Sequence, residues 1–179
     1  MVVAMSSDLK AVLLRQYDMA WRLAELHLDA LTTEDCLWRP GGEAGLHVWR
    51  DDASGRWHAD WPDREDYEIG PASLGWITWH LIFWWQTVLD QSFGDGQLAR
   101  ENVLWPGSAD GVREEVRALA CRWRALVEGL DDEALTSSGL TRWPFKERPF
   151  AEVVAWANVE LMKSASEMGY VLFLKRGAK

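Results

Sequence analysis

The chain has 179 residues, the size of one ordinary domain that can bury a hydrophobic core without disulfides. Its 28 acidic and 19 basic residues give a formal net charge of −9, which disfavours nucleic acid and anionic membranes because phosphate binding depends on Lys and Arg. Cys36 and Cys121 are too few for a disulfide framework, and the first ten residues lack the apolar core of a signal peptide. We therefore expect a reduced, cytoplasmic, single-domain protein (residues 1–179) with no nucleic-acid or membrane partner.

The first predicted element is a long amphipathic helix over about residues 7–31, where hydrophobic residues recur at helical spacing. Thr32 and Asp35 follow it at the spacing in which a hydroxyl and a carboxylate cap a short helical turn. Pro40 and the two glycines after it then predict that the chain reverses direction.

A long connection, residues 38–70, separates this helix from the next. Hydrophobic and polar residues alternate over residues 46–61, which predicts a two-stranded β-hairpin around a turn at residues 52–55. A connection of this length in a compact domain is usually functional or disordered, and its tryptophans argue against disorder. We expect an ordered lid over one end of the helices, with a merely decorative surface hairpin as the alternative.

The most apolar stretch, residues 71–90, predicts a buried helix with Ser73 as a candidate N-cap. At 100° per residue, one face of this helix carries Trp76, His80, Phe83 and Trp84. His80 is therefore expected to face the interior, close to the last helix. A buried imidazole there needs a hydrogen-bond partner, a metal or a ligand, because leaving it unpaired costs free energy.

Two more helices are predicted, over residues 112–130 and about 149–175. Four long helices without a run of strands predict an all-α four-helix bundle, with residues 38–70 as its main insertion. On the last helix, Asn158 belongs to the apolar stripe, and one flank of that stripe carries Glu160, Ser164 and Glu167.

His80, Glu160 and Glu167 are the candidate metal ligands, since imidazole nitrogen and carboxylate oxygen suit a divalent ion such as zinc or nickel. The chain has no H-x-x-x-H or H-E-x-x-H motif, and such residues are more often a satisfied histidine and a solvated face. Periodicity also predicts that Lys163 points away from His80 and forms only a surface pair with Glu167. The predicted pocket-lining residues are Trp76, Phe83, Trp84, Asn158 and Ser164.

Three short motifs resemble the DinB/YfiT-like superfamily: L-T-T-E-D-C-L-W-R-P at residues 31–40, W-x-x-x-H at Trp76 and His80, and E-M-G-Y at residues 167–170. The resemblance implies a four-helix bundle, often dimeric, that holds a divalent metal through one helix-two histidine and an H-x-x-x-H pair on helix four. Some members are thiol-dependent transferases or isomerases. His80 matches the helix-two ligand, whereas Lys163 and Glu167 stand where the two helix-four histidines would be. A charged lysine has no lone pair and repels a cation, so this resemblance implies a degenerate metal site.

Three function classes remain open, and the sequence names no catalytic residue and no substrate. We favour a small-ligand-binding bundle that has lost the three-histidine site and uses His80 as a hydrogen-bonding or general-base group. The alternatives are a divalent-metal-dependent enzyme resembling the thiol-dependent transferases, and a non-catalytic homodimeric scaffold in which tryptophans pack between subunits.

The favoured class makes three predictions about metal and stability. The protein should purify without stoichiometric zinc or nickel, and chelator should leave the melting temperature unchanged. His80→Ala should cost about 1–3 kcal/mol through a cavity and a lost hydrogen bond.

Overall fold

The computed structural model describes residues 6–64 and 66–177, and within these residues the chain is mainly helical. The helices are α1 (Ser6–Ala30), α2 (Thr33–Leu37), α3 (Leu74–Phe93), α4 (Ala109–Gly129), α5 (Asp132–Thr136) and α6 (Phe150–Gly177). Strands β1 (Val48–Arg50) and β2 (Trp57–Ala59) form a small antiparallel sheet, and Arg100–Asn102 form a 3-10 turn. The predicted all-α class is confirmed.

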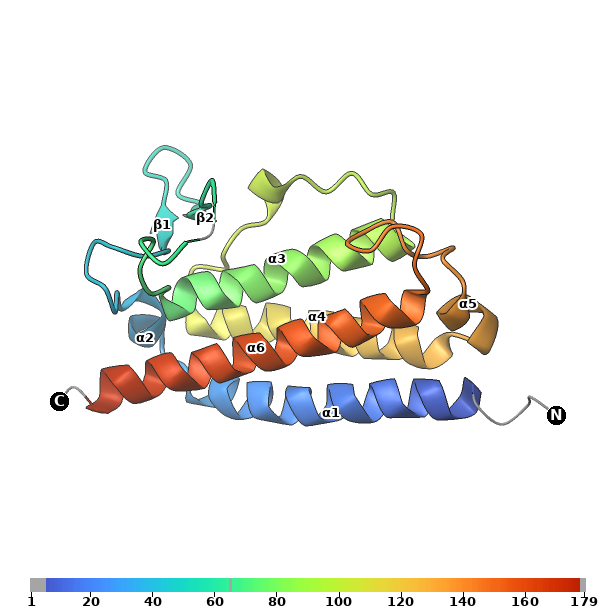
Figure 1. Ribbon diagram of the computed structural model, residues 1–179. Coiled ribbons are helices and arrows are strands. Elements are labelled where there is room, and N and C mark those ends of the chain that lie inside the picture. The colour runs from blue at the N-terminus through green and yellow to red at the C-terminus, as the bar shows by residue number, and fades with distance from the viewer. Residues whose placement is uncertain (1–5, 65, 178–179) are drawn as a thin grey trace.

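The four long helices lie side by side (Figure 1). Helix α1 packs against α6 and α4, and α3 packs against the same two helices. Helices α1 and α6 run in one direction, whereas α3 and α4 run in the other. Because α3 and α4 are parallel, residues 94–108 must return along the length of α3 before α4 begins. This return brings the loop beside the hairpin, over the N-terminal end of α3.

The helix ends follow local capping chemistry. Ser73 Oγ accepts a hydrogen bond from Trp76 N at 3.2 Å, so Ser73 is the N-cap, as predicted, and α3 begins at Leu74. Thr32 and Asp35 form the predicted capping box, with both bonds at 3.1 Å. Helix α5 was not predicted; its N-cap Asp131 opens a five-residue helix in the same way as Thr32 opens α2.

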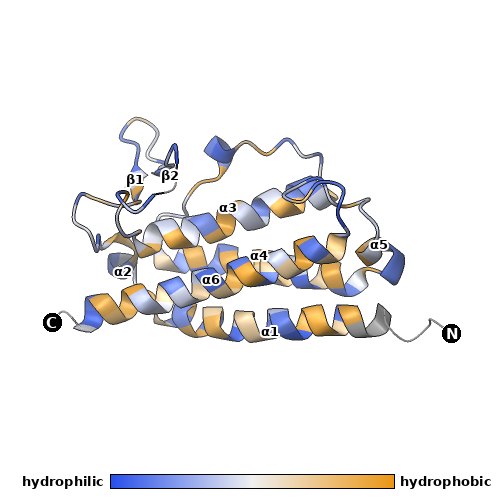
Figure 2. Ribbon diagram, in the orientation of Figure 1, coloured by the Kyte–Doolittle hydropathy of each residue, from blue (hydrophilic) through white to orange (hydrophobic). Residues whose placement is uncertain are grey.

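Tryptophans fill much of the core between the long helices. Fully buried are Trp79, Trp84, Trp85, Trp105 and Trp123. Ring pairs connect different elements: Trp84 meets Trp156 of α6 at 5.7 Å between centroids, and Trp21 of α1 meets Trp85 at 6.3 Å. Figure 2 shows hydrophobic stretches along all four long helices, as this shared core requires. These five tryptophans therefore pack within one chain, whereas Trp49 and Trp61 of the long connection are 45% and 46% exposed.

The predicted β-hairpin is confirmed, with Trp49 of β1 opposite His58 of β2. Asp60 closes its base, because Asp60 Oδ2 accepts from His47 N at 2.8 Å and Asp60 O accepts from Trp76 Nε1 at 2.8 Å. On the other side, Trp57 O accepts from Trp105 N at 3.1 Å. The hairpin is thus tied both to α3 and to the loop that returns from α3 to α4.

Candidate functional site

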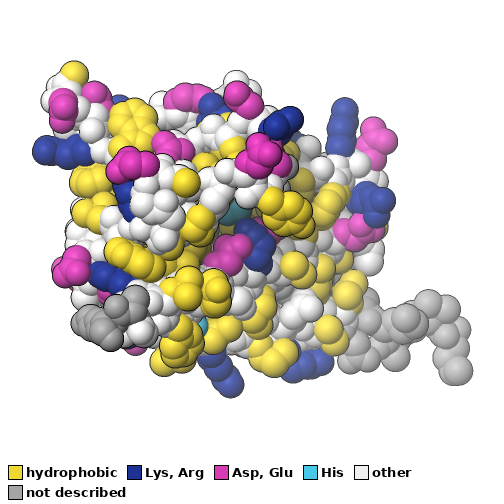
Figure 3. All heavy atoms as spheres, turned by 60° about the vertical axis from the view of Figure 1, so that its left-hand side comes forward, with side chains coloured by type: hydrophobic (Ala, Val, Ile, Leu, Met, Phe, Trp, Pro, Cys, Tyr) yellow, Lys and Arg dark blue, Asp and Glu magenta, His cyan; other side chains and the backbone are white. Residues whose placement is uncertain are grey.

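A cavity of about 490 Å³ lies between the segment of residues 46–70, the first turns of α3, and α6. Figure 3 shows a hollow on this face, with a histidine side chain at its floor and acidic and basic side chains beside it. The cavity is lined by Leu46, Trp61, Pro62, Asp63, Arg64, Asp66, Ile69, Gly70, Trp76, His80, Lys163 and Glu167. A concave, partly aromatic site with a few converging polar groups is typical of small-molecule binding.

His80 forms part of the floor and is half-buried. Its ring stacks on Trp76, one helical turn earlier, with 4.8 Å between centroids and 9° between planes. Burial, reinforced by the positive charge of Lys163, lowers the pKa of His80 to about 4. The imidazole is therefore neutral near pH 7 and offers one donor and one acceptor nitrogen.

The hydrogen bond expected for His80 is not found, since none of the described residues bonds to its ring. The His80 ring instead contacts two aromatic rings of α3: it stacks on Trp76 and lies 6.5 Å from Phe83 between centroids. Any contribution of this side chain to the free energy of unfolding must therefore come from packing. Its two ring nitrogens remain available to hydrogen-bond with a ligand in the cavity.

Lys163 lies between two carboxylates of α6. Its Nζ is 3.4 Å from Glu160 Oε2 and 3.7 Å from Glu167 Oε2. Burial raises the pKa of Glu167; the nearby Glu160 charge adds to this rise, and Lys163 opposes it. The two glutamates thus share one ammonium group.

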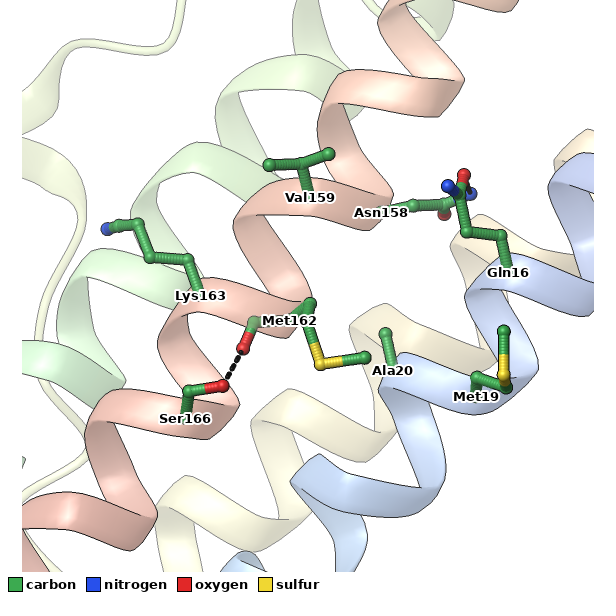
Figure 4. A pocket seen from close by; sticks show the side chains of 8 residues that line it. All are labelled: Gln16, Met19, Ala20, Asn158, Val159, Met162, Lys163 and Ser166. Atoms are coloured by element: carbon green, nitrogen blue, oxygen red, sulfur yellow. Dashed lines mark hydrogen bonds between the residues drawn. The ribbon is translucent and has the colours of Figure 1, made fainter.

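The expectation that Lys163 points away from His80 was wrong, because both side chains line the same cavity. In Figure 4 the Lys163 side chain extends from α6 toward α3, while the neighbouring Met162 points toward α1. Periodicity fixes only the direction of the Cα–Cβ bond. The flexible four-carbon stem of lysine then carries the ammonium group to the acidic neighbours.

The proposed metal ligands do not fit a metal ion. The Lys163 ammonium lies beside both Glu160 and Glu167, where it would repel a divalent cation. Across residues 6–64 and 66–177, no group of three or more His, Cys, Asp or Glu side chains is arranged to hold a metal. We therefore assign no chemistry to a metal at this site.

The predicted pocket residues separate in the structure, and of the five only Trp76 lines the His80 cavity. Phe83 lies beside it, stacked on Trp79 at 5.4 Å. Trp84 is buried against Trp85 and Trp156, and Ser164 is fully buried. Asn158 Nδ2 donates to Leu13 O at 2.9 Å and faces α1 instead.

Sequence reasoning missed the lining residues that the connection contributes, among them Leu46, Trp61, Arg64 and Ile69. The available signal was the predicted lid: an ordered aromatic segment over the end of α3 must cover something. Trp61 belongs to this covering segment, and its ring packs edge-on against Phe83 of α3 with 5.4 Å between ring centroids.

An apolar hollow of about 180 Å³ adjoins the His80 cavity and shares Trp76 and Glu167 with it. Its other lining residues are Pro40, Pro71, Ala72, Ile77, Tyr170, Val171 and Leu174. The two spaces together offer a polar part beside His80 and an apolar part beyond Trp76.

A separate groove of about 470 Å³ runs between α1 and α6 (Figure 4). Met19 and Ala20 line it from α1, and Val159 and Met162 line it from α6. Met19 and Val159 are about 60% exposed, at 62% and 59%, so this groove is an apolar surface open to solvent.

The fold and the cavity define a helical protein with a lidded site at the junction of α3 and α6. Comparison with protein families matches residues 16–168 to the DinB superfamily, so the chain belongs to that superfamily. The search of curated proteins and the search of solved structures give no match. None of the helices in the described ranges is long and apolar enough to cross a membrane.

Proposed function

We propose that this protein is a small-ligand-binding member of the DinB superfamily, built as a four-helix bundle, whose ligand occupies the His80 cavity without a metal ion. The observation that carries the proposal is the position of Lys163. Its ammonium stands in the cavity with His80, at the position where the resemblance places a histidine ligand. This fixed organic cation lies between Glu160 and Glu167, where an exchangeable metal ion would otherwise have to sit.

The cavity has the features that binding requires. Trp61 and Trp76 supply apolar walls, while His80, Lys163 and Glu167 supply a small set of polar groups. A metal-dependent thiol transferase is less well supported, because the lysine replaces a ligand and repels the ion that such chemistry needs.

Binding can be tested in EDTA with three fragments of similar shape: 2-phenylethanol, phenethylamine and 3-phenylpropionate. We expect ligand-observed NMR to detect at least one of them with the wild-type protein. Ile69→Trp should abolish that binding by filling the cavity, whereas Leu37→Trp should not, because Leu37 lies outside it. Binding of none of the fragments, or binding unchanged in Ile69→Trp, would refute the proposal.

A second proposal concerns self-association through the α1/α6 face. Three exposed residues of α1, Val12, Met19 and Leu26, are spaced seven apart and therefore share one helix face. Helix α6 adds Val159, Met162, Tyr170 and Phe173 at alternating spacings of three, eight and three. An exposed apolar surface of this kind supports a homodimer that associates through α1 and α6.

Light scattering coupled to size exclusion tests this dimer. We expect the wild-type protein to have twice the chain mass and Met19→Glu to have the monomer mass, because a charge would be buried in the interface. Leu37→Glu changes an exposed leucine elsewhere and should stay dimeric. A monomeric wild-type protein at micromolar concentration would exclude this role for the face.

A further inference from the structure

We propose that the ligand of the His80 cavity is a primary amine that binds as its ammonium form and carries an apolar body. This inference rests on the proposed small-ligand function and adds the chemical class of the ligand. It is argued from the charges of the cavity, from its hydrogen-bonding groups and from its apolar walls.

The charges around the cavity do not balance. Its lining contains three acidic side chains, Asp63, Asp66 and Glu167, and two basic ones, Arg64 and Lys163. Arg64 Nε pairs with Asp66 Oδ2 at 2.8 Å, and Lys163 is shared by Glu167 and the adjacent Glu160. Among the described residues, the lining thus carries three carboxylates and two cations, an excess of one negative charge. A cationic ligand would supply the missing counter-charge in a site partly shielded from water.

The hydrogen-bonding groups point to a ligand that donates. Neutral His80 has an acceptor nitrogen that no described residue occupies, and Glu167 adds a carboxylate to the same lining. Arg64 and Lys163 also line the cavity, where each lies beside a carboxylate, Asp66 and Glu167 respectively. An ammonium group has three donors and no acceptor, so it can donate to the His80 nitrogen and to the Glu167 carboxylate together. A carboxylate ligand would instead add acceptors and negative charge.

The walls indicate what the amine is attached to. Trp61 and Trp76 supply aromatic side chains to the lining of the cavity. Beyond Trp76 and Glu167, the apolar hollow lined by Pro71, Tyr170 and Leu174 offers about 180 Å³ more. A ligand with its ammonium near Glu167 can therefore place a hydrocarbon or aromatic body against these rings.

Isothermal titration calorimetry in EDTA at pH 7.5 compares three probes of similar shape: phenethylamine (cationic), 2-phenylethanol (neutral) and 3-phenylpropionate (anionic). We expect phenethylamine to bind about tenfold more tightly than the alcohol, since a charge-assisted hydrogen bond outweighs a neutral one. The carboxylate should bind most weakly. Raising NaCl from 50 to 500 mM should weaken binding of the amine and leave that of the alcohol unchanged.

Matched variants of α6 locate the charge. Glu167→Gln should weaken phenethylamine binding about tenfold and leave 2-phenylethanol unaffected. Glu152→Gln is the control: its side chain is 44% exposed against 43% for Glu167, it also pairs with a basic residue four positions away, and it lies outside the cavity. Lys163→Met should tighten phenethylamine binding, because the competing cation is gone. Circular dichroism verifies that each variant is folded.

The failures are distinguishable. If 2-phenylethanol or 3-phenylpropionate binds the wild-type cavity as tightly as phenethylamine, the amine inference is refuted and the ligand-binding function stands. The inference is also refuted if Glu167→Gln binds phenethylamine as well as Glu152→Gln does. If none of the three probes binds, both the amine inference and the proposed small-ligand function are refuted.

Discussion

His80 is neutral because of its surroundings. Its ring is stacked on Trp76 and partly removed from water. The positive charge of Lys163 is also close enough to oppose protonation of the imidazole. Protonation of His80 would place two cations, His80 and Lys163, in the same cavity. The neutral imidazole is thus the state in which the folded protein keeps this residue at physiological pH.

This state predicts an acid-sensitive contribution to folding. The pKa of His80 is about 4 in the folded protein and about 6.5 in an unfolded chain, so the unfolded state takes up the proton first as the pH falls. The contribution is fully present above pH 6.5 and is lost as the pH falls from 6.5 toward 4. Urea unfolding should show a loss of up to about 3 kcal/mol over this window that His80→Gln lacks.

His58→Gln is the matched control, because His58 lies on the hairpin and stacks on Trp49 instead of facing the cavity. It should keep the acid sensitivity of the wild-type protein. If His80→Gln and the wild-type protein lost stability in parallel between pH 6.5 and 4, His80 would not be the group responsible.

At the scale of elements, α3 approaches the lid closely at Gly75. A Cβ atom there would lie 2.5 Å from Val48 Cγ2 of β1 and 2.8 Å from Cys36 O, both closer than packed atoms allow. The absence of a side chain therefore sets how near β1 and the end of α2 can lie to α3. That spacing in turn fixes the lid over the cavity.

Gly75→Ala should destabilise the fold by about 1–3 kcal/mol, since overpacking forces backbone shifts that exceed the gain in helix propensity. Amides of β1 and β2 should exchange faster in this variant, as measured by hydrogen–deuterium exchange. Gly129→Ala is the control, because its added Cβ would meet no atom within 4 Å. Equal free energies of unfolding for the two variants would show that the lid can move away from α3 without loss of stability, which would contradict this prediction.

Local rules explain which parts of the fold could be predicted. Capping by Thr32, Asp35 and Ser73 depends on residues within three positions, so these helix starts were readable from the sequence. The cavity was not readable in the same way. Trp76 and Trp84 share a helix face, but eight residues separate them by about 12 Å along the axis. Only Trp76 lies under the lid, and the lid position depends on long-range packing at Gly75 and Asp60.

The whole molecule should be independent of divalent metal. A metal that bound only the native state would raise the melting temperature, and its removal would lower it. Because Lys163 lies against Glu160 and Glu167, we expect EDTA to leave the melting temperature unchanged within about 1 °C. We also expect elemental analysis of untagged protein to show no stoichiometric zinc or nickel.

A reverse variant makes this test two-sided. Lys163→His restores an imidazole at the position where the resemblance places one, next to His80 and Glu167. Added zinc should raise the melting temperature of this variant and leave that of the wild-type protein unchanged. A drop of several degrees when EDTA is added to the wild-type protein, reversed by one equivalent of zinc or nickel, would contradict the metal-free assignment.

The aromatic contacts of α3 also give the protein a built-in optical reporter. Trp76 contacts Trp79 at 6.2 Å, and Trp79 contacts Trp61 at the same distance, so the rings that line the cavity belong to a larger coupled set. Indoles this close exchange excitation energy and perturb one another's transitions. Emission and near-ultraviolet circular dichroism therefore report on the group of rings together. A molecule that settles against Trp76 should change the optical spectrum of the protein without any attached dye.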